Sequence, residues 1–191
     1  MVDKFWDQQD LHPKRKFRWL LYFDGMPQFV AKSVTKPGFS IGTTPHQFLQ
    51  HTFNFPGRVT WSDVTLTIVD PVQPDSAASL YAILLDSGYV KPDQIQSLAD
   101  GEGYGTIAKD KMVSRLGNKV RIEQIGIDSS NDVIESWTLF NPQITNVTFD
   151  TLDYTSDDLL NITIALKYDW ASLNDAAPVG SDQIWPKTVI D

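Results

Sequence analysis

The chain has 191 residues, of which 41% are hydrophobic and 21% are charged. These values are ordinary for a globular protein, and the length suits one domain with a substantial core. The absence of cysteine excludes disulfides and thiolate sites. No run of about 18 or more apolar residues predicts a membrane-spanning helix, and the first residues lack the apolar stretch of a secretory signal peptide.

The net charge of −8 is spread unevenly along the chain. Residues 1–121 carry 14 basic and 12 acidic side chains, whereas residues 122–191 carry 2 basic and 12 acidic ones. An acidic surface repels phosphate groups, which argues against ordinary nucleic-acid binding. Solubility alone is the other interpretation of this excess.

The N-terminal part predicts an arm followed by a hairpin. Residues 1–16 are polar, with a basic cluster at 14–16, so we expect an arm there. Large apolar side chains then occupy every second position, as in a strand with one buried face: Phe17, Trp19, Leu21 and Phe23. A turn at 24–27 and a β-prone segment at 29–35 predict a second strand that pairs with the first.

Residues 40–57 form a β-prone segment bracketed by prolines. We assign its large apolar side chains to both faces of the segment: Phe48, Leu49, Phe53 and Phe55. Such a segment is awkward inside one small domain and suits a long hairpin or loop that lies on another subunit. An internal strand pair is the alternative, and the residues alone do not decide between the two.

A strand and a helix are predicted next. Residues 58–69 alternate with a change of phase at Ser62-Asp63, which indicates a β-bulge. Asp75 or Ser76 can cap a following helix that ends at Ser87-Gly88. One apolar stripe runs along that helix: Ala77, Leu80, Tyr81, Leu84 and Leu85.

Residues 89–117 allow either a short helix within 106–116 or an irregular connection. Residues 118–170 contain three β-prone runs separated by turns, which predicts an antiparallel meander. In the last run, one face is apolar and predicted to be buried: Ile162, Ile164, Leu166 and Tyr168. Residues 171–191 are expected to form a polar arm with one adhesive spot at 184–186.

The sum of these elements predicts an all-β fold with some helix (a β-rich α+β fold). We expect an antiparallel β-barrel or sandwich with one packed amphipathic helix and a long protruding hairpin.

No residue set indicates catalysis or metal binding, and we expect no enzyme, no cofactor and no metal. His12, His46 and His51 are scattered, and the spacing of the last two predicts opposite faces of a strand. The acidic turn Asp153, Asp157 and Asp158 lacks the spacing of a calcium loop, so a turn role is favoured over a cation site. Four tryptophans fall in strand patterns, where core packing is the default: Trp19, Trp61, Trp137 and Trp170.

Four stretches, taken in chain order, carry a resemblance to a known family. They are FRWLLYFDGMPQFVAKSVTKPGF, FPGRVTWSDVTLTIVDP, the amphipathic helix that comes next, and WTLFNPQI…LDYTSDDLLNITIALKYDW. In this order they resemble the tail tube proteins of contractile-tailed bacteriophages, which are similar in fold to the tube proteins of type VI secretion systems and R-type pyocins. The resemblance covers residues 17–170, the last stretch is the strongest, and none of the motifs is catalytic.

The resemblance implies a structural virion protein with a β domain at 17–170 between arms at 1–16 and 171–191. Such proteins assemble into hexameric rings that stack into the tail tube, through which DNA passes without specific binding. The implied partners are further copies of the chain and the tail sheath, baseplate and tail-terminator proteins. The implied location is the phage tail, assembled in the host cytoplasm.

The resemblance also implies roles for particular residues. Contacts between subunits are expected at Phe48, Leu49, Phe53, Phe55 and Trp185. Carboxylates that face the lumen and repel DNA phosphates are expected among Glu123, Asp128, Glu135 and Asp150. Two alternatives stay open: a baseplate tube-initiator ring of the same fold, and a monomeric ligand-binding β-barrel with its own apolar cavity.

Overall fold

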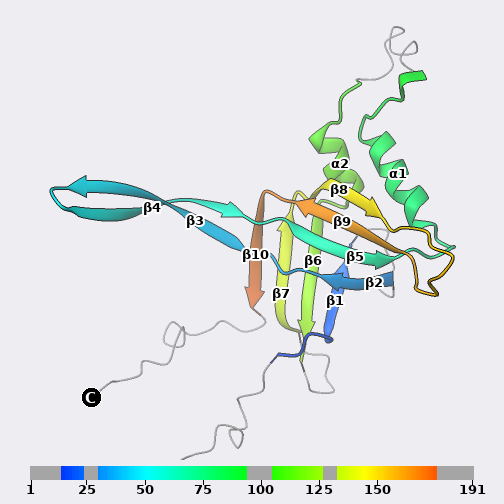
Figure 1. Ribbon diagram of the computed structural model, residues 1–191, viewed down its shortest axis with the longest axis horizontal. Helices are drawn as coiled ribbons and strands as arrows, with labels where there is room; N and C mark the ends of the chain where they lie inside the picture. Colours follow the sequence, from blue (N-terminus) through cyan, green and yellow to red (C-terminus); the bar gives the residue numbers. More distant parts are fainter. Residues whose placement is uncertain (1–13, 24–29, 94–104, 127–132, 176–191) are drawn as a thin grey trace, which may run out of the picture.

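The computed structural model describes residues 14–23, 30–93, 105–126 and 133–175. Within these ranges the chain forms strands and two helices (Figure 1). In chain order they are β1 Trp19–Tyr22, β2 Ala31–Val34, β3 Phe39–Phe48, β4 His51–Trp61, β5 Val64–Val69, α1 Ser76–Asp86, α2 Lys109–Arg115, β6 Lys119–Ile125, β7 Val133–Phe140, β8 Gln143–Phe149, β9 Asn161–Lys167 and β10 Trp170–Asp175.

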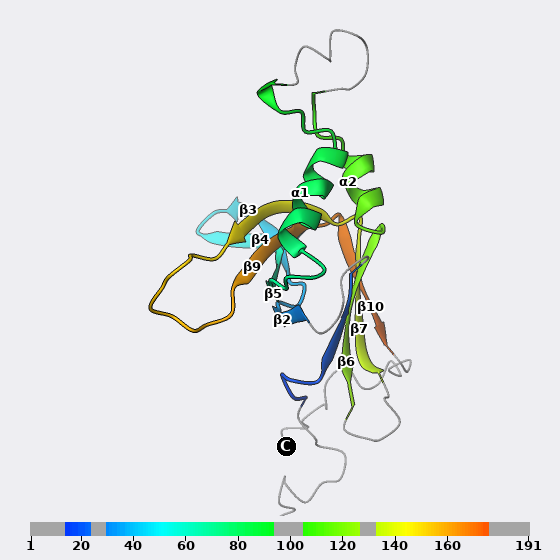
Figure 2. The ribbon, with the colours of Figure 1, turned by 90° about the vertical axis from the view of Figure 1, so that its right-hand side faces the viewer.

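The described strands form two four-stranded antiparallel sheets and one separate hairpin. Sheet A has the order β1-β6-β7-β10, sheet B has the order β2-β5-β9-β8, and β3 pairs with β4. The strands of the two sheets cross one another (Figure 1), and Figure 2 shows sheet A nearly edge-on. The two helices lie at one end of this sandwich. The β-rich architecture predicted from the sequence is confirmed, with the long hairpin projecting from it.

The core lies between the two sheets and follows from the alternating sequence pattern. The inward residues of β5 and β9 are almost completely buried: Val64, Leu66, Ile68, Ile162, Ile164 and Leu166. Leu21, Ile122 and Leu139 face them from sheet A. Full burial of each such side chain stabilises the fold by roughly 1.5–3 kcal/mol. Because the buried residues of β5 and β9 occupy every second position, the predicted period of two is confirmed for these strands.

The helix α1 begins at its predicted cap. The Asp75 carboxylate accepts a hydrogen bond from the Ala78 amide at 2.9 Å, and the helix ends before Gly88, whose φ is 109°. Leu80 is buried in the core, but Tyr81 is 45% exposed, so the predicted apolar stripe does not all face inward. The short helix α2 realises one of the two possibilities for residues 106–116, and its Met112 is buried.

Three predictions about strand pairing are wrong. β1 pairs with β6, and β2 pairs with β5, so they do not form an N-terminal hairpin. The phase change at Ser62-Asp63 is not a bulge but the boundary between β4 and β5, which lie in different sheets. The expected three-run meander over residues 118–170 does not form, because its middle run breaks into β7 in sheet A and β8 in sheet B. Alternation reports which face of a strand is buried but not which strand lies beside it.

The closing strand β10 pairs with β7 and reaches Asp175, so sheet A includes residues beyond position 170.

Candidate assembly surfaces

The hairpin β3–β4 is the most exposed element of the described chain. Its register runs from Phe39↔Trp61 at the root to Phe48↔His51 at the tip, and every residue from Phe39 to Thr60 is exposed. Neither strand pairs with another described strand. This arrangement confirms a protruding hairpin rather than an internal strand pair. A lone two-stranded ribbon is only marginally stable in water, so contact with a further surface would stabilise this one.

The outer half of the hairpin has one aromatic face. The cross-strand pairs Phe48↔His51, His46↔Phe53 and Thr44↔Phe55 place all six side chains on the same side of the ribbon. The expectation of apolar side chains on both faces is therefore wrong for this half. The histidines also share a face, contrary to the prediction from their spacing. We use the name aromatic face for Phe48, Phe53 and Phe55 with His46 and His51.

The tip and the root of the hairpin differ in their attachment. Leu49 occupies the turn with a φ of 54° and is 88% exposed. At the root, the Trp61 ring contacts Phe39 at 5.6 Å and Tyr168 at 6.0 Å between centroids. The Tyr168 hydroxyl donates a hydrogen bond to the Ser62 carbonyl at 2.9 Å. Because Tyr168 is buried in the core, the root is fixed while the tip projects.

Four of the five residues expected to contact another subunit are therefore exposed on this hairpin. The exposed fractions are 61% for Phe48, 88% for Leu49, 52% for Phe53 and 57% for Phe55. Trp185 lies outside the described residues.

Both sheets end in strands that lack a second neighbour among the described residues. The edges are β1 and β10 in sheet A and β2 and β8 in sheet B. On β10, the Trp170 ring stacks on the Phe140 ring with 4.9 Å between the centroids, and Trp170 remains 47% exposed. The prediction that this tryptophan packs in the core is therefore wrong. Trp19, Trp61 and Trp137 do pack against the core.

Three of the four acids expected to face a lumen lie in the described chain, and two of them, Glu123 and Glu135, lie on opposite sides of sheet A. Glu123 lies on the side of sheet A that faces away from the core, where it pairs with Arg121 at 2.9 Å. Glu135 lies on β7 on the opposite side, because it is in register with Gln124 rather than Glu123. Asp150 follows β8 and accepts a hydrogen bond from Asn161 at 3.1 Å. Asp128 lies outside the described residues.

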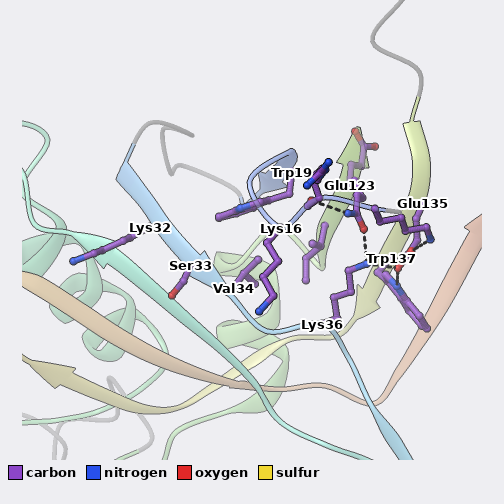
Figure 3. Close-up of a pocket in the computed structure, with 13 residues that line it drawn as sticks. Lys16, Trp19, Lys32, Ser33, Val34, Lys36, Glu123, Glu135 and Trp137 are labelled. Carbon is purple, nitrogen blue, oxygen red and sulfur yellow. Dashed lines mark hydrogen bonds and ion pairs between the residues drawn. The ribbon is translucent and has the colours of Figure 1, made fainter. Parts of the chain in front are cut away.

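Glu135 sits in an ion cluster that sequence reasoning missed (Figure 3). Its carboxylate accepts hydrogen bonds from Lys14, from Lys36 at 2.7 Å and from the Trp137 indole. Burial by itself raises the pKa of this carboxyl, but the hydrogen bonds from Lys14, Lys36 and Trp137 outweigh burial and lower the pKa from 4.5 to about 2. The cluster borders an open cavity of about 580 Å³ between the two sheets.

The other polar candidates have structural roles. Asp153 accepts hydrogen bonds from the Thr155 amide at 2.9 Å and hydroxyl at 2.8 Å, which supports the turn role. Within the described residues, no group of three or more His, Asp or Glu side chains is placed to hold a metal ion. His12 lies outside these residues. No helix of the described chain has the length and apolar character needed to cross a membrane.

No protein-family model matches the chain, and no curated protein matches it. Solved structures do match. A chain of the anti-feeding prophage tube terminating cap superimposes with a TM-score of 0.63 at 18% identity, covering 92% of this chain and 100% of that one. A chain of the sheath–tube complex of PVC, an extracellular contractile injection system, gives 0.61 at 16% identity, with coverage of 87% and 94%.

A chain of the six-fold symmetrised anti-feeding prophage baseplate gives a TM-score of 0.54 at 14% identity, covering 86% of this chain and 97% of that one. The described protein therefore has the tail tube protein fold, which recurs in tube, cap and baseplate structures of contractile injection systems.

Proposed function

We propose that this chain is a structural protein of a contractile phage tail and that it forms stacked hexameric rings of the tail tube. The observation that carries the proposal is the uncovered hairpin. It is long, anchored at its root and aromatic on one face, and it has no covering element among the described residues. An exposed apolar surface of this kind marks an interaction site. The fold shared with a chain of the PVC sheath–tube complex supports this assignment.

The topology of the sheets is compatible with ring closure. Each sheet has four strands that alternate in direction, so its two edge strands run antiparallel to each other. Copies joined edge to edge by rotation about one axis keep this alternation across every junction. Closure of the ring removes open edges, which are otherwise a liability for aggregation.

Negative-stain electron microscopy of the purified protein tests the proposal. We expect hollow tubes of stacked rings with hexameric symmetry. A chain that stays monomeric at all concentrations, as a ligand-binding barrel does, would overturn the proposal. The described strands form separate sheets around a packed aliphatic core, whereas such a ligand-binding protein needs a single closed barrel.

A second candidate is a single ring of the same fold that starts or ends the tube. The match to a chain of the tube terminating cap, which is covered completely, favours this alternative. The match to a baseplate chain favours the starting position. Copy number separates the roles, because a tube protein stacks to the length of the tail whereas an initiator or cap forms one ring.

The proposal includes passage of DNA through the tube. Acidic side chains concentrate in the exposed segment 150–158, which contains Asp150, Asp153, Asp157 and Asp158. Hydrogen bonds from Asn161 and Thr151 lower the pKa of Asp150, so this carboxylate is ionised at neutral pH. Its charge repels phosphates wherever it faces the passing genome.

Charge reversal tests this part of the proposal. We expect virions that carry Asp150→Lys to eject DNA more slowly, with an effect that weakens as salt increases, because a lysine attracts phosphate. Asp150→Asn removes the carboxylate without adding a cation and serves as the matched control. Equal ejection rates for the lysine variant and the unmodified protein would count against a luminal position for Asp150.

A further inference from the structure

An apolar cleft lies beside the helices, far from the hairpin. It is open to solvent, has a volume of about 330 Å³ and is lined by residues of α1, α2 and β8 and by Ile107. None of the described residues that line it is charged. Its lining includes Tyr81, Leu84, Ile107, Met112, Val147 and Phe149. Three of these large side chains are between 45% and 54% exposed: Tyr81, Ile107 and Phe149.

The cleft explains why α1 carries a wider apolar stripe than its contact with the core uses. Leu80 and Ile83 pack against the core and also border the cleft, whereas Tyr81 and Leu84 line the cleft without belonging to the core cluster. A helix that covers only a core needs a single apolar stripe. Within the described chain the Tyr81 ring meets Lys91, whose Nζ lies 5.6 Å from the ring centroid. The part of Tyr81 that stays exposed is available for a second contact.

Two exposed segments of the chain carry large apolar side chains that could enter this cleft. One is the loop 150–160, in which Leu152 is 81% exposed, but this loop also carries four aspartates. The other is the hairpin, whose residues 39–57 include no Asp, Glu, Lys or Arg. Burial of a carboxylate against an uncharged surface is costly, so a cleft whose described lining carries no charge favours the uncharged hairpin.

The hairpin that fills the cleft must come from a second copy. Figure 1 shows the hairpin projecting away from the sandwich, while α1 and α2 cover a different side of it. The contacts among Phe39, Trp61 and Tyr168 fix the root and prevent the ribbon from folding back over its own helices.

We infer that the hairpin tip of one copy, at Phe48 and Leu49, docks in the cleft between α1, α2 and β8 of another copy. A volume of about 330 Å³ is at the lower end of protein pockets, so it accepts the tip rather than the whole ribbon. The donor and acceptor surfaces differ, and a contact of this heterologous kind either closes a ring or continues from ring to ring. The inference rests on the proposed self-assembly and names the surface that receives the hairpin.

Cross-linking in the cysteine-free chain tests this contact directly. Leu49→Cys protein is mixed with Tyr81→Cys protein, allowed to assemble and treated with a short bismaleimide. Both positions are exposed, at 88% and 45%, so the substitutions spare the core. The matched control replaces Tyr81→Cys with Val72→Cys, which is 92% exposed and outside the cleft. We expect at least about tenfold more cross-linked dimer from the cleft pair than from the control pair.

The possible failures are distinguishable. If electron microscopy shows tubes or rings but the cleft pair and the control pair cross-link equally, the cleft is not the receptor and the proposed function stands. If no assembly forms under any condition, both the inference and the proposed function are overturned.

A charge-exchange variant gives a second, independent measurement. Leu49→Asp is expected to abolish assembly, because it places a carboxylate at the tip that would be buried in an uncharged cleft. Adding Tyr81→Lys to the same chain is expected to restore assembly, since each tip then meets a cation in the neighbouring cleft. Failure of Tyr81→Lys to restore any assembly would overturn the assignment of this cleft.

Discussion

Glu135 connects parts of the chain that are distant in sequence. Lys14 and Lys36, which are 121 and 99 residues away, both donate to its carboxylate. Lys36 also donates to Gln124 at 2.6 Å, and Gln124 donates to the Arg15 carbonyl at 3.0 Å. The cluster thus ties residues 14–15 and the segment after β2 to the centre of sheet A. Its carboxylate is paired with two cations, so it offers little net charge to a passing polyanion.

The lowered pKa of Glu135 predicts a specific dependence of stability on pH. Because the pKa is about 2 in the folded chain and near 4.5 otherwise, the stabilisation is complete above pH 4.5 and is lost as the pH falls towards 2. We expect Glu135→Gln to lower the free energy of unfolding at pH 7 by roughly 1.5–3 kcal/mol, the value of hydrogen bonds to a charged group.

The difference between the two proteins should shrink as the pH falls through that window. Chemical denaturation at pH 7, 5 and 3 measures it. Two curves that stay parallel across the window would show that the ion cluster does not stabilise the fold.

At the scale of elements, two glycines lie opposite each other across the hairpin and differ in the space that each has for a side chain. A Cβ atom added to Gly57 would lie 3.1 Å from the Gly42 carbonyl oxygen, whereas one added to Gly42 would meet the Arg58 carbonyl oxygen at an ordinary 3.6 Å. The register shifts between Ile41 and Thr43, so the backbones approach closely at an irregular point in the ladder.

These two glycines form a matched pair of test sites. We expect Gly57→Ala to push the strands apart, reduce hydrogen-exchange protection in the outer hairpin and reduce the yield of assembled protein. Gly42→Ala should do neither. The melting temperature of the dissociated protein should change little for both variants, because the hairpin lies outside the core. Equal behaviour of the two variants in hydrogen exchange would contradict this account.

The elements differ in how far the sequence predicts them. The strand Asn161–Lys167 was predictable because one of its faces is buried, and burial imposes a period of two. Its neighbours were not predictable, because strands of both sheets share that period and only tertiary contacts assign the partner. The same limit explains why the orientation of α1 was missed, since its apolar residues serve both the core and the cleft.

The sequence also predicted the candidate assembly surfaces only in part. From the residues alone the proline-bracketed run allowed either a hairpin that lies on another subunit or an internal strand pair. In the structure it is a protruding hairpin, and Phe48, Phe53 and Phe55 are exposed. The side of the ribbon on which they lie depends on the register across the turn, which the sequence pattern does not specify. The Glu135 cluster was missed because sequence patterns carry no signal for ion pairs across more than ninety residues.

At the scale of the whole molecule, the described chain leaves many large apolar side chains uncovered. They include residues of the hairpin, of the loop 150–160 and of the cleft: Phe39, Ile41, Phe48, Leu49, Phe53, Phe55, Leu152, Tyr154, Leu159, Tyr81, Ile107 and Phe149. Apolar surface of this extent is uncommon on a monomer and is usual where subunits meet. A chain that joins copies of itself covers these residues without any further protein.

This coverage links assembly to thermal stability. Anything that binds only the folded chain stabilises it by mass action. In the proposed assembly the bound species is another copy, so we expect the melting temperature to rise with protein concentration. The triple variant Phe48→Ser, Phe53→Ser and Phe55→Ser removes the apolar part of the aromatic face but leaves the core intact. We expect its melting temperature to be independent of concentration and to equal that of the dilute unmodified protein.

Calorimetry over a hundredfold range of concentration, with sedimentation to follow assembly, provides the measurement. A melting temperature of the unmodified chain that stays constant while sedimentation reports assembly would show that the contacts between copies do not stabilise the folded chain. Concentration dependence that persists in the triple variant would instead place the stabilising contact outside the aromatic face, for example on the open sheet edges or on the exposed loop 150–160.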